Sequence, residues 1–397
     1  MSQIHNIEEI RKIDAISGAD LIQYSLEGIC QILLRGKGST QSHKKRRLME
    51  QSEHLMHLQD LQNGTFYSSR IDDSSKGGML AWKIPLLMCV DSCPIILEGF
   101  EHEQSVHLIA VGSQGGDIVL VDNSGTSLHR YKIEGKIEGE MSALTIAQMS
   151  HDDCLEEKTI LFVPTYKVGS VTKDKGKLEA FEIKWNEPGS QIFSHSWNYT
   201  STGEIKNKPL AFRFKNTNAF RVIVCDYDGS VSYLNAADGA LLECNTSIRG
   251  AIHADPTLVI GAEDNISIVV ASSSWNGTVT MFSVGCDSLT IIWSMKTWVP
   301  IYSSPFLYRS DIILFSVEGA VTSLNIDDGS ETWKVLTKEK QPIFCGCCSL
   351  TIERESYVVF GSHDGNIRCI SSNEGRTKWT TNLGSPILSR PIFLLLL

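Results

Sequence analysis

The chain has 397 residues, of which 42% are hydrophobic and 21% charged, as is typical of a soluble globular protein. Its formal net charge at pH 7 is −10, and residues 1–80 hold ten basic and ten acidic residues, so the whole acidic excess lies after residue 80. That excess argues against binding of the later region to nucleic-acid phosphates. No apolar run reaches the roughly 18 residues that a membrane-spanning helix needs.

The N-terminal sequence and the cysteines predict a cytoplasmic protein. The opening residues MSQIHNIEEIRK contain no apolar core of the kind that a secretory signal has. The eleven cysteines are scattered singly and do not form the spaced framework of a disulfide-rich protein. Both features favour a reducing, intracellular compartment.

Residues 1–35 are predicted to form a helical segment, and residues 36–79 a polar linker. Ile4, Ile7 and Ile10 recur every three residues, and a second apolar face runs over residues 21–33. The linker is rich in Gly, Ser, Gln and His and poor in large aliphatic residues. It contains the basic run HKKRR at 43–47, which we interpret as a solvated charge run in preference to a nuclear-localisation signal.

Residues 80–397 are predicted to be one all-β repeat domain, a β-propeller of about seven blades whose last blade is incomplete. In the clearest unit, residues 361–379, a hairpin turn precedes an alternating strand, and a second turn follows it. Steps of 42 to 49 residues separate most units, which matches the blade period of roughly 40–50 residues. The two turn glycines are ten residues apart in three units, in the pairs Gly229 and Gly239, Gly319 and Gly329, and Gly365 and Gly375.

Each unit begins with a short apolar run and ends with an aromatic residue. Trp333 and Trp379 lie four residues after the second turn glycine, and together with Trp293 they are predicted to pack one blade against another. Cys244 replaces the aromatic residue in one unit. The six units open near Pro94, Ala143, Pro209, Pro256, Pro305 and Cys347.

The two ends of the repeat region predict how the ring closes. The residues around Trp82 match the end of a unit, so we expect them to form an outer strand that completes the last blade. A seventh unit opens at residues 384–386 and contains only its innermost strand, in PIFLLLL at 391–397. We therefore expect a truncated or alternatively ended product that is marginally stable as an isolated monomer.

The candidate metal ligands are Cys345, Cys347, Cys348 and His363. The C-x-C-C spacing does not match the cysteine pairs of zinc sites, and only the first two of these cysteines share a strand face, so packing in the core is the favoured interpretation. His363 and His253 precede turns and are predicted to form hydrogen bonds there. No catalytic, cofactor-binding or metal-binding residue is predicted.

Three further tryptophans, Trp197, Trp275 and Trp298, fall outside the repeat pattern. If an aromatic side chain faces a ligand in the axial funnel of the propeller, we expect it to be one of these three.

The repeat units carry a family resemblance. LNIDDGSETW at 324–333 and CISSNEGRTKW at 369–379, each preceded by x-G-x-[VI], resemble the repeat of quinoprotein-dehydrogenase-like propellers, the pyrroloquinoline-quinone repeat family. WKIPLLMCVDSCPII at 82–96 resembles the C-terminal propeller of acyl-activating enzymes of the beta-alanine-activating type. The likeness covers about residues 80–397. It implies an accessory part of an ATP-dependent acid-thiol ligase, whose partner is a carrier or adenylation domain.

The catalytic modules of such ligases are not recognisable in this chain. We find no Gly/Ser/Thr-rich phosphate-binding loop that ends in Lys, and no G-x-D-S-L serine for a pantetheine arm. The nearest string, residues 17–21, lacks the serine after Asp20. We therefore do not expect this chain alone to activate an acid, and we expect no cofactor.

Three hypotheses of function follow. The first is a non-catalytic interaction or regulatory propeller of an acyl-activating enzyme, and the second is an independent scaffold that binds a protein. The third and most remote is a quinone-dependent dehydrogenase. The resemblance implies that such an enzyme would stack a vicinal cysteine pair on the quinone, for which Cys347 and Cys348 are the only match, and no set of Asp, Glu and Asn completes its calcium site.

Overall fold

The computed structural model describes residues 22–26, 29–34, 55–60, 65–70 and 79–395. Within the last range it leaves out residues 87, 102–103, 123, 150–154, 168–174, 185–192, 215–216, 218, 262–264, 338–339, 353–354 and 392. The residues that it describes are strands and turns without an α-helix. Accordingly, no helix in this part of the chain is long and apolar enough to span a bilayer.

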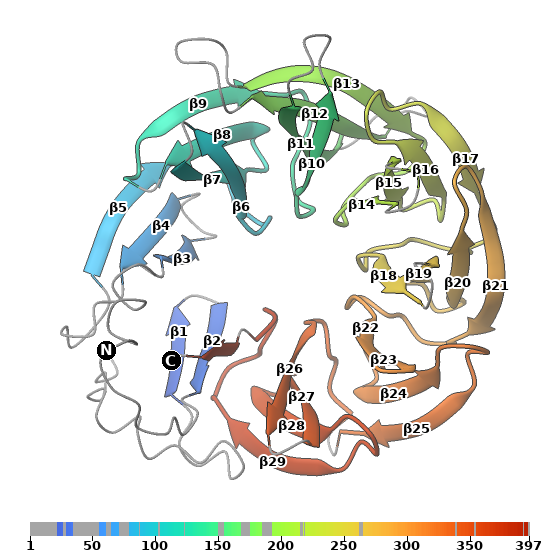
Figure 1. The fold of residues 1–397 in the computed structure, drawn as a ribbon. Helices are drawn as coiled ribbons and strands as arrows, with labels where there is room; N and C mark the ends of the chain where they lie inside the picture. Colours follow the sequence, from blue (N-terminus) through green and yellow to red (C-terminus); the bar gives the residue numbers. More distant parts are fainter. Residues whose placement is uncertain are drawn as a thin grey trace.

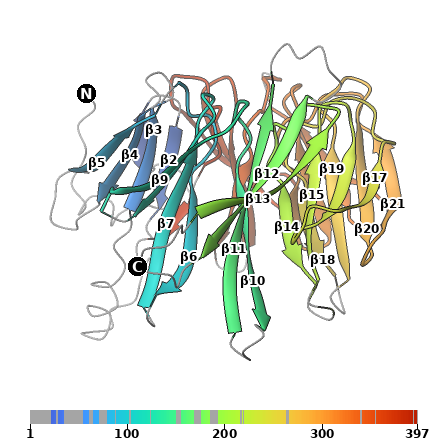
Figure 2. The same ribbon diagram turned by 90° about the horizontal axis from the view of Figure 1, so that it is seen from above.

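Six antiparallel sheets of four strands and two sheets of three strands are arranged around a central axis (Figure 1). We number the four-stranded sheets as blades I to VI in chain order. In each blade the first strand lies nearest the axis and the fourth is outermost (Figure 1), and the blades stand side by side when the ring is seen edge-on (Figure 2). The all-β propeller predicted from the sequence is confirmed.

Each blade is a meander of four consecutive strands. Blade I contains β6 (Ile95–Glu101), β7 (Gln104–Gly112), β8 (Asp117–Asp122) and β9 (Ser127–Lys132). Blade II contains β10 (Ser142–Met149), β11 (Leu155–Tyr166), β12 (Gly176–Lys184) and β13 (Phe193–Ser201). Blade III contains β14 (Leu210–Arg213), β15 (Phe220–Cys225), β16 (Val231–Asn235) and β17 (Leu241–Asn245). Blade IV contains β18 (Thr257–Ile260), β19 (Ile266–Ala271), β20 (Thr278–Val284) and β21 (Leu289–Lys296). Blade V contains β22 (Phe306–Tyr308), β23 (Asp311–Phe315), β24 (Ala320–Asn325) and β25 (Glu331–Leu336). Blade VI contains β26 (Cys347–Ile352), β27 (Glu355–Gly361), β28 (Asn366–Ser371) and β29 (Thr377–Asn382).

The position of a strand within its blade sets its residue pattern. In β15 all six residues are buried, because each middle strand is covered by a neighbouring blade on both faces. In β25 half-buried residues alternate with exposed ones, as expected for an outer strand with one face in water. The apolar core therefore lies between the blades, and each cluster combines two of them, as Phe162 of blade II and Leu234 of blade III do.

Tryptophans of the outer strands pack one blade against the next. Each packs its indole on the second-turn glycine of the following blade, where a Cβ would lie only 2.4 to 2.7 Å from the ring. These glycines have φ between 67° and 75°, a region that favours glycine. The pairs are Trp197 with Gly239, Trp293 with Gly329, and Trp333 with Gly375. The packing role predicted for Trp293 and Trp333 is confirmed, and Trp197, which we had placed outside the repeat, shares it.

A polar contact replaces the tryptophan between blades III and IV, where Cys244 stands at the aromatic position. The Arg221 Nε donates to the carbonyl of Cys286 at 2.9 Å, and the Tyr233 hydroxyl donates to the same carbonyl at 3.0 Å. Arg221 also pairs with Asp287 at 2.9 Å. Arg221 and Tyr233 are both buried, so two hydrogen-bond donors hold the turn that an indole holds elsewhere.

Two of the cysteines at residues 345–348 lie in the apolar core, as the sequence predicted. Cys345 and Cys347 are buried in the apolar cluster between blades V and VI, and Cys348 is half-buried. Burial raises the pKa of the Cys347 thiol well above its usual value, which keeps the thiol protonated. The core-packing interpretation is confirmed for Cys345 and Cys347.

The N-terminal segments differ from two predictions. The part of the helical segment that the structure describes is the hairpin β1 (Ile22–Leu26) and β2 (Ile29–Leu34), and the region predicted as a linker contains β3 (Leu55–Asp60) and β4 (Thr65–Arg70). A helix over residues 22–34 is therefore wrong, whereas residues 4–21 lie outside the description. Short apolar runs have too few periods to separate helix from strand, and partner strands decide the outcome.

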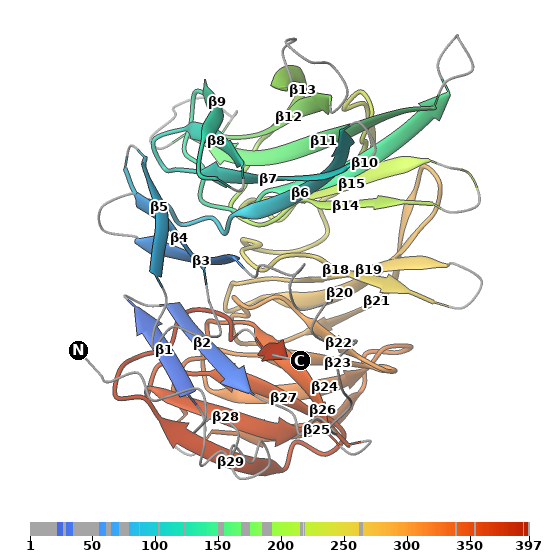
Figure 3. The same cartoon turned by 60° about the vertical axis from the view of Figure 1, so that its left-hand side comes forward.

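Closure of the ring also differs from the prediction. The strand that contains Trp82, β5 (Met79–Pro85), pairs with β4 and not with the last blade. The C-terminal strand β30 (Phe393–Leu395) pairs in parallel with β2 (Figure 3). A single strand from the seventh unit is thus present as predicted, but β1 and β2 complete its sheet. The sequence around residue 82 specifies an outer strand without specifying the edge on which it pairs.

Candidate interaction site at the axial mouth

The segments that lead into the innermost strands share one burial pattern. In residues 205–209, 252–256 and 301–305, a buried isoleucine, a buried small residue and a buried proline alternate with two half-buried positions. This alternation has the period of an extended chain, so the two half-buried side chains of each segment lie on the same side. The repeat therefore presents two variable side chains per blade beside the axis.

Backbone hydrogen bonds hold these segments in register. The N–H group of the buried isoleucine donates to a carbonyl in the turn between the second and third strands of the preceding blade. The donor–acceptor pairs are Ile137 with Ser113, Ile252 with Asp226, Ile301 with Ser272, Ile343 with Ser316, and Ile387 with Ser362, at 3.1 to 3.3 Å. Because the same bond recurs from blade to blade, the variable side chains stand at equivalent positions around the ring.

Aromatic rings at the first variable position form a continuous arc. His253 lies 5.4 Å from Tyr302 between ring centroids, and Tyr302 lies 5.7 Å from Phe344, both edge to face. Turn residues extend this row at both ends, with Tyr227 6.1 Å from His253 and His363 6.2 Å from Phe344. We call these five residues the axial arc. Such edge-to-face pairs add stability beyond area burial and fix the orientation of each ring.

A caged lysine continues the arc over blades II and III. The Lys206 Nζ lies 4.3 Å from the ring centroid of Tyr166 and 4.8 Å from that of Tyr227. It also pairs with Glu204 at 3.0 Å and lies 3.8 Å from Glu138. The Tyr166 hydroxyl donates to Glu138 at 2.6 Å, which joins the two walls of the cage. This end of the site is therefore charged, whereas the end over blades IV to VI is aromatic.

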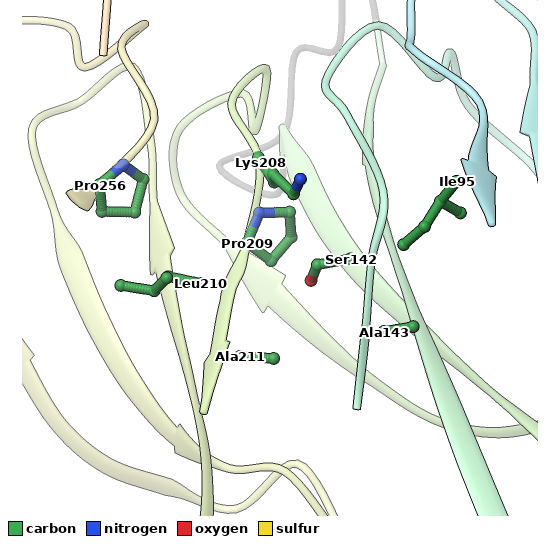
Figure 4. A pocket seen from close by; sticks show the side chains of 8 residues that line it. All are labelled: Ile95, Ser142, Ala143, Lys208, Pro209, Leu210, Ala211 and Pro256. Atoms are coloured by element: carbon green, nitrogen blue, oxygen red, sulfur yellow. The ribbon is translucent and has the colours of Figure 1, made fainter. Parts of the chain in front are cut away.

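The second variable position forms a polar row below the arc. The backbone N–H of Lys208 and the hydroxyl of Ser304 both donate to Asp255, at 2.8 and 3.0 Å, and the Lys208 Nζ lies 3.4 Å from Glu140. Beside this row opens a small pocket of about 210 Å³ (Figure 4). It is lined by the first residues of the inner strands and by residues just before them, namely Ile95, Ser142, Ala143, Lys208, Pro209, Leu210, Ala211 and Pro256.

Burial keeps several titratable side chains of the site uncharged. Burial raises the pKa values of Tyr166 and Tyr227, so both phenols stay protonated. Burial lowers the pKa of His253, which keeps the imidazole neutral. These groups offer aromatic faces and hydrogen bonds, in contrast to the activated nucleophile of a covalent catalyst.

The residues singled out in the sequence fall partly inside this site. His253 and His363 lie in the axial arc and contact aromatic rings there; the His363 N–H also donates to the Pro342 carbonyl at 2.9 Å. Trp197 packs between blades and does not face the axis, so that expectation is wrong for this residue. Trp275 and Trp298 are largely exposed on the side of blade IV where its segment enters blade V.

Sequence reasoning missed the arc itself. A signal was present in the recurring I-x-x-x-P spacing of IKNKP at 205–209, IHADP at 252–256, IYSSP at 301–305 and ILSRP at 387–391. The proline had been used only to mark the start of each unit. The first variable position, directly after the isoleucine, holds Lys, His, Tyr and Leu in these four segments. Because these residues differ in type, they do not form a recognisable sequence motif.

Protonation of His253 should destabilise the propeller. The folded-state pKa of this histidine lies below the ordinary 6.5, so the unfolded chain binds the proton more readily. The contribution of His253 to the free energy of unfolding should therefore be fully present above pH 6.5. It should be lost as the pH falls below 6.5. Urea titrations at pH 7.5 and 5.5 should show a larger loss for the wild type than for His253→Phe. Equal losses in the two proteins would contradict this assignment.

Comparisons with known proteins agree with the repeat and the fold. The family model PQQ_2, described as "Outer membrane protein assembly factor BamB", matches residues 227–392, which is less than half of the chain. The BamB protein of Salmonella typhimurium is 29% identical over 112 residues, which cover 26% of this chain and 29% of that protein. The Escherichia coli BamB protein is 28% identical over 97 residues, or 23% of this chain and 25% of that protein.

Solved structures extend the likeness over most of the chain. The crystal structure of BamB from Moraxella catarrhalis superimposes with a TM-score of 0.53 at 17% identity, covering 85% of this chain and 87% of that one. Saccharomyces cerevisiae Sqt1 gives a TM-score of 0.58 at 10% identity, covering 82% of each chain. At these identities the likeness shows the fold alone. The chain matches less than a third of the sequence of the curated BamB proteins, and its residues 227–392 resemble the BamB-like, pyrroloquinoline-quinone repeat.

Proposed function

We propose that this chain is a non-catalytic propeller that binds another protein, and that a segment of the partner lies across the axial arc. The observation that carries the proposal is the continuous row of rings from Tyr227 to His363, in which His253, Tyr302 and Phe344 stand at equivalent positions of successive blades. Aromatic side chains that keep a polar tip are the residues most enriched where proteins meet. The BamB proteins that match in sequence are named as assembly factors, which is consistent with this class of function.

Site-specific photocrosslinking tests this proposal. We expect a benzophenone side chain placed at Phe344 or Tyr302 to form a crosslink to a cellular protein, whereas the same group at the exposed Thr380 of β29 should not. The captured protein is identified by mass spectrometry, purified and titrated against the chain. Tyr302→Ala should then lower its affinity at least tenfold without lowering the unfolding temperature by more than a few degrees. Equal crosslinking at Thr380, or unchanged affinity of Tyr302→Ala, would refute the assignment.

A more specific form of the proposal names the partner as a carrier or adenylation domain of an acyl-activating enzyme. Its support is the resemblance of residues 82–96 to the propeller of such enzymes. Titration with a purified carrier domain of that enzyme class separates the two forms, because only the specific one predicts saturable binding that Tyr302→Ala weakens. We also propose a cytoplasmic location, which is supported by eleven cysteines that do not form the spaced framework of a disulfide-rich protein. Fluorescence microscopy of the tagged chain tests it.

A further inference from the structure

Blade IV departs from the repeat in the turn that carries Trp275. In blades I, III, V and VI this turn closes with a backbone hydrogen bond between residues four apart, as from Asp226 N to Ser230 O. In blade IV the corresponding bond runs from Ser272 N to Thr278 O and spans six residues. The two additional residues place Trp275 at the tip of the turn, where 62% of its surface is exposed. Among the described residues, the apolar cluster of blades IV and V does not include this side chain.

A second exposed tryptophan lies in the segment that is hydrogen-bonded to the long turn. Trp298 follows Thr297, whose N–H donates to the carbonyl of Gly277 at 3.1 Å, two residues after Trp275. It is also 62% exposed, and its φ of 58° is a left-handed conformation that is unfavourable for a bulky side chain. Strained backbone at an exposed aromatic residue is retained where the surroundings enforce it and is typical of binding surfaces.

One basic side chain lies against the indole of Trp298, and a second basic residue lies in the segment that contacts the long turn. The Lys296 Nζ lies 4.8 Å from the ring centroid of Trp298. Exposed Arg249 lies at the base of the long turn, because its carbonyl accepts hydrogen bonds from the hydroxyls of Ser272 and Ser274. The adjoining turn of blade V adds one charge of each sign, in Glu318 and Lys340, so the surroundings stay positive. This local excess is the opposite of the net charge of −10 of the whole chain.

We infer that Trp275, Trp298, Arg249 and Lys296, which we call the tryptophan patch, bind an acidic segment of a partner protein that also carries a bulky apolar side chain. The indoles would bury that side chain, and the two cations would pair with its neighbouring carboxylates. Charge complementarity selects this occupant, since a basic segment would be repelled at the patch. The inference rests on the proposal that this face binds protein, but it uses none of the axial-arc residues.

Synthetic peptides provide the probe. Fluorescein-labelled twelve-residue peptides that combine Glu and Asp with one Phe, Leu or Pro are titrated by anisotropy. A matched set replaces every acid with Lys, and a third set replaces the apolar residue with Ser. We expect saturable binding in the acidic apolar set, and at least tenfold weaker binding in both matched sets. Arg249→Glu with Lys296→Glu should lower the affinity further than raised salt does.

The variant Trp298→Asn separates binding from folding. Asparagine tolerates the left-handed conformation, so this protein should unfold at the same temperature as the wild type or higher, yet bind the acidic peptides at least tenfold more weakly. Ile260→Ser is the matched control, because Ile260 is 59% exposed on the same blade and lies at the opposite end of its strands. Tyr302→Ala should leave the affinity for the peptides unchanged, because Tyr302 belongs to the axial arc and not to the tryptophan patch. Peptide binding at the patch and partner binding at the arc can therefore fail independently of each other. The inference is overturned if no acidic peptide binds, or if Trp298→Asn binds as tightly as the wild type.

Discussion

Replacing Trp197 with alanine should lower the free energy of unfolding by about 3–5 kcal/mol. The indole is buried between blades II and III, with its ring centroid 5.8 Å from that of Phe162 and its face on Gly239. The alanine variant loses this contact area and leaves a cavity that the twisted sheets cannot close. Guanidinium titrations of the two proteins measure the difference. Trp275→Ala is the control, because an exposed tryptophan should change the free energy by less than about 0.5 kcal/mol.

The glycine partner makes the same contact testable from the other side. A Cβ on Gly239 would lie 2.4 Å from the Trp197 ring, and the φ of 75° adds a backbone cost of about 1 kcal/mol for any other residue. Gly239→Ala should therefore be strongly destabilising alone and much less so in a Trp197→Leu background, with a coupling energy above about 1 kcal/mol. Additive effects of the two substitutions would show that the indole and the glycine do not act as one contact.

Much of this architecture could be predicted from the sequence, because its determinants are local. The ten-residue spacing of Gly229 and Gly239 encodes two tight turns around a strand, and the structure has both. A tryptophan four residues after such a glycine marks an outer strand, which holds for Trp333 and Trp379. Trp197 escaped this rule because blade II lacks the regular spacing, although its packing partner is equivalent.

The parts that could not be predicted depend on pairing between distant residues. The side chains of the axial arc differ in type, and each contacts a neighbour about 20 to 50 residues away, as His253 contacts Tyr302. Likewise, the sequence around Trp82 specifies an outer strand, but the choice between β4 and the last blade depends on which edge is free. The hairpin of β1 and β2 was mistaken for helix because 13 residues of mixed apolar sequence fit either period.

The polar contact between blades III and IV should prove nearly as important as a tryptophan. Arg221→Met should cost about 2–3 kcal/mol, since a buried charged donor is lost from the Cys286 carbonyl and the pairing with Asp287 disappears. Tyr233→Phe should cost about 1 kcal/mol, because its hydroxyl donates to the carbonyls of Gly285 and Cys286. Urea titration of each variant, with Arg249→Met as the exposed control, measures these differences.

Combining the two substitutions decides whether they act on one group. Either donor alone can satisfy the Cys286 carbonyl, so each single variant leaves that oxygen paired. The double variant removes both donors from the Cys286 carbonyl, which lies beside the apolar cluster of blades III and IV. Loss of both hydrogen bonds adds a desolvation cost of about 1–3 kcal/mol. Its loss of stability should therefore exceed the sum of the single losses. A merely additive result would mean that water replaces the lost donors, and that blade III is held to blade IV mainly by its apolar cluster.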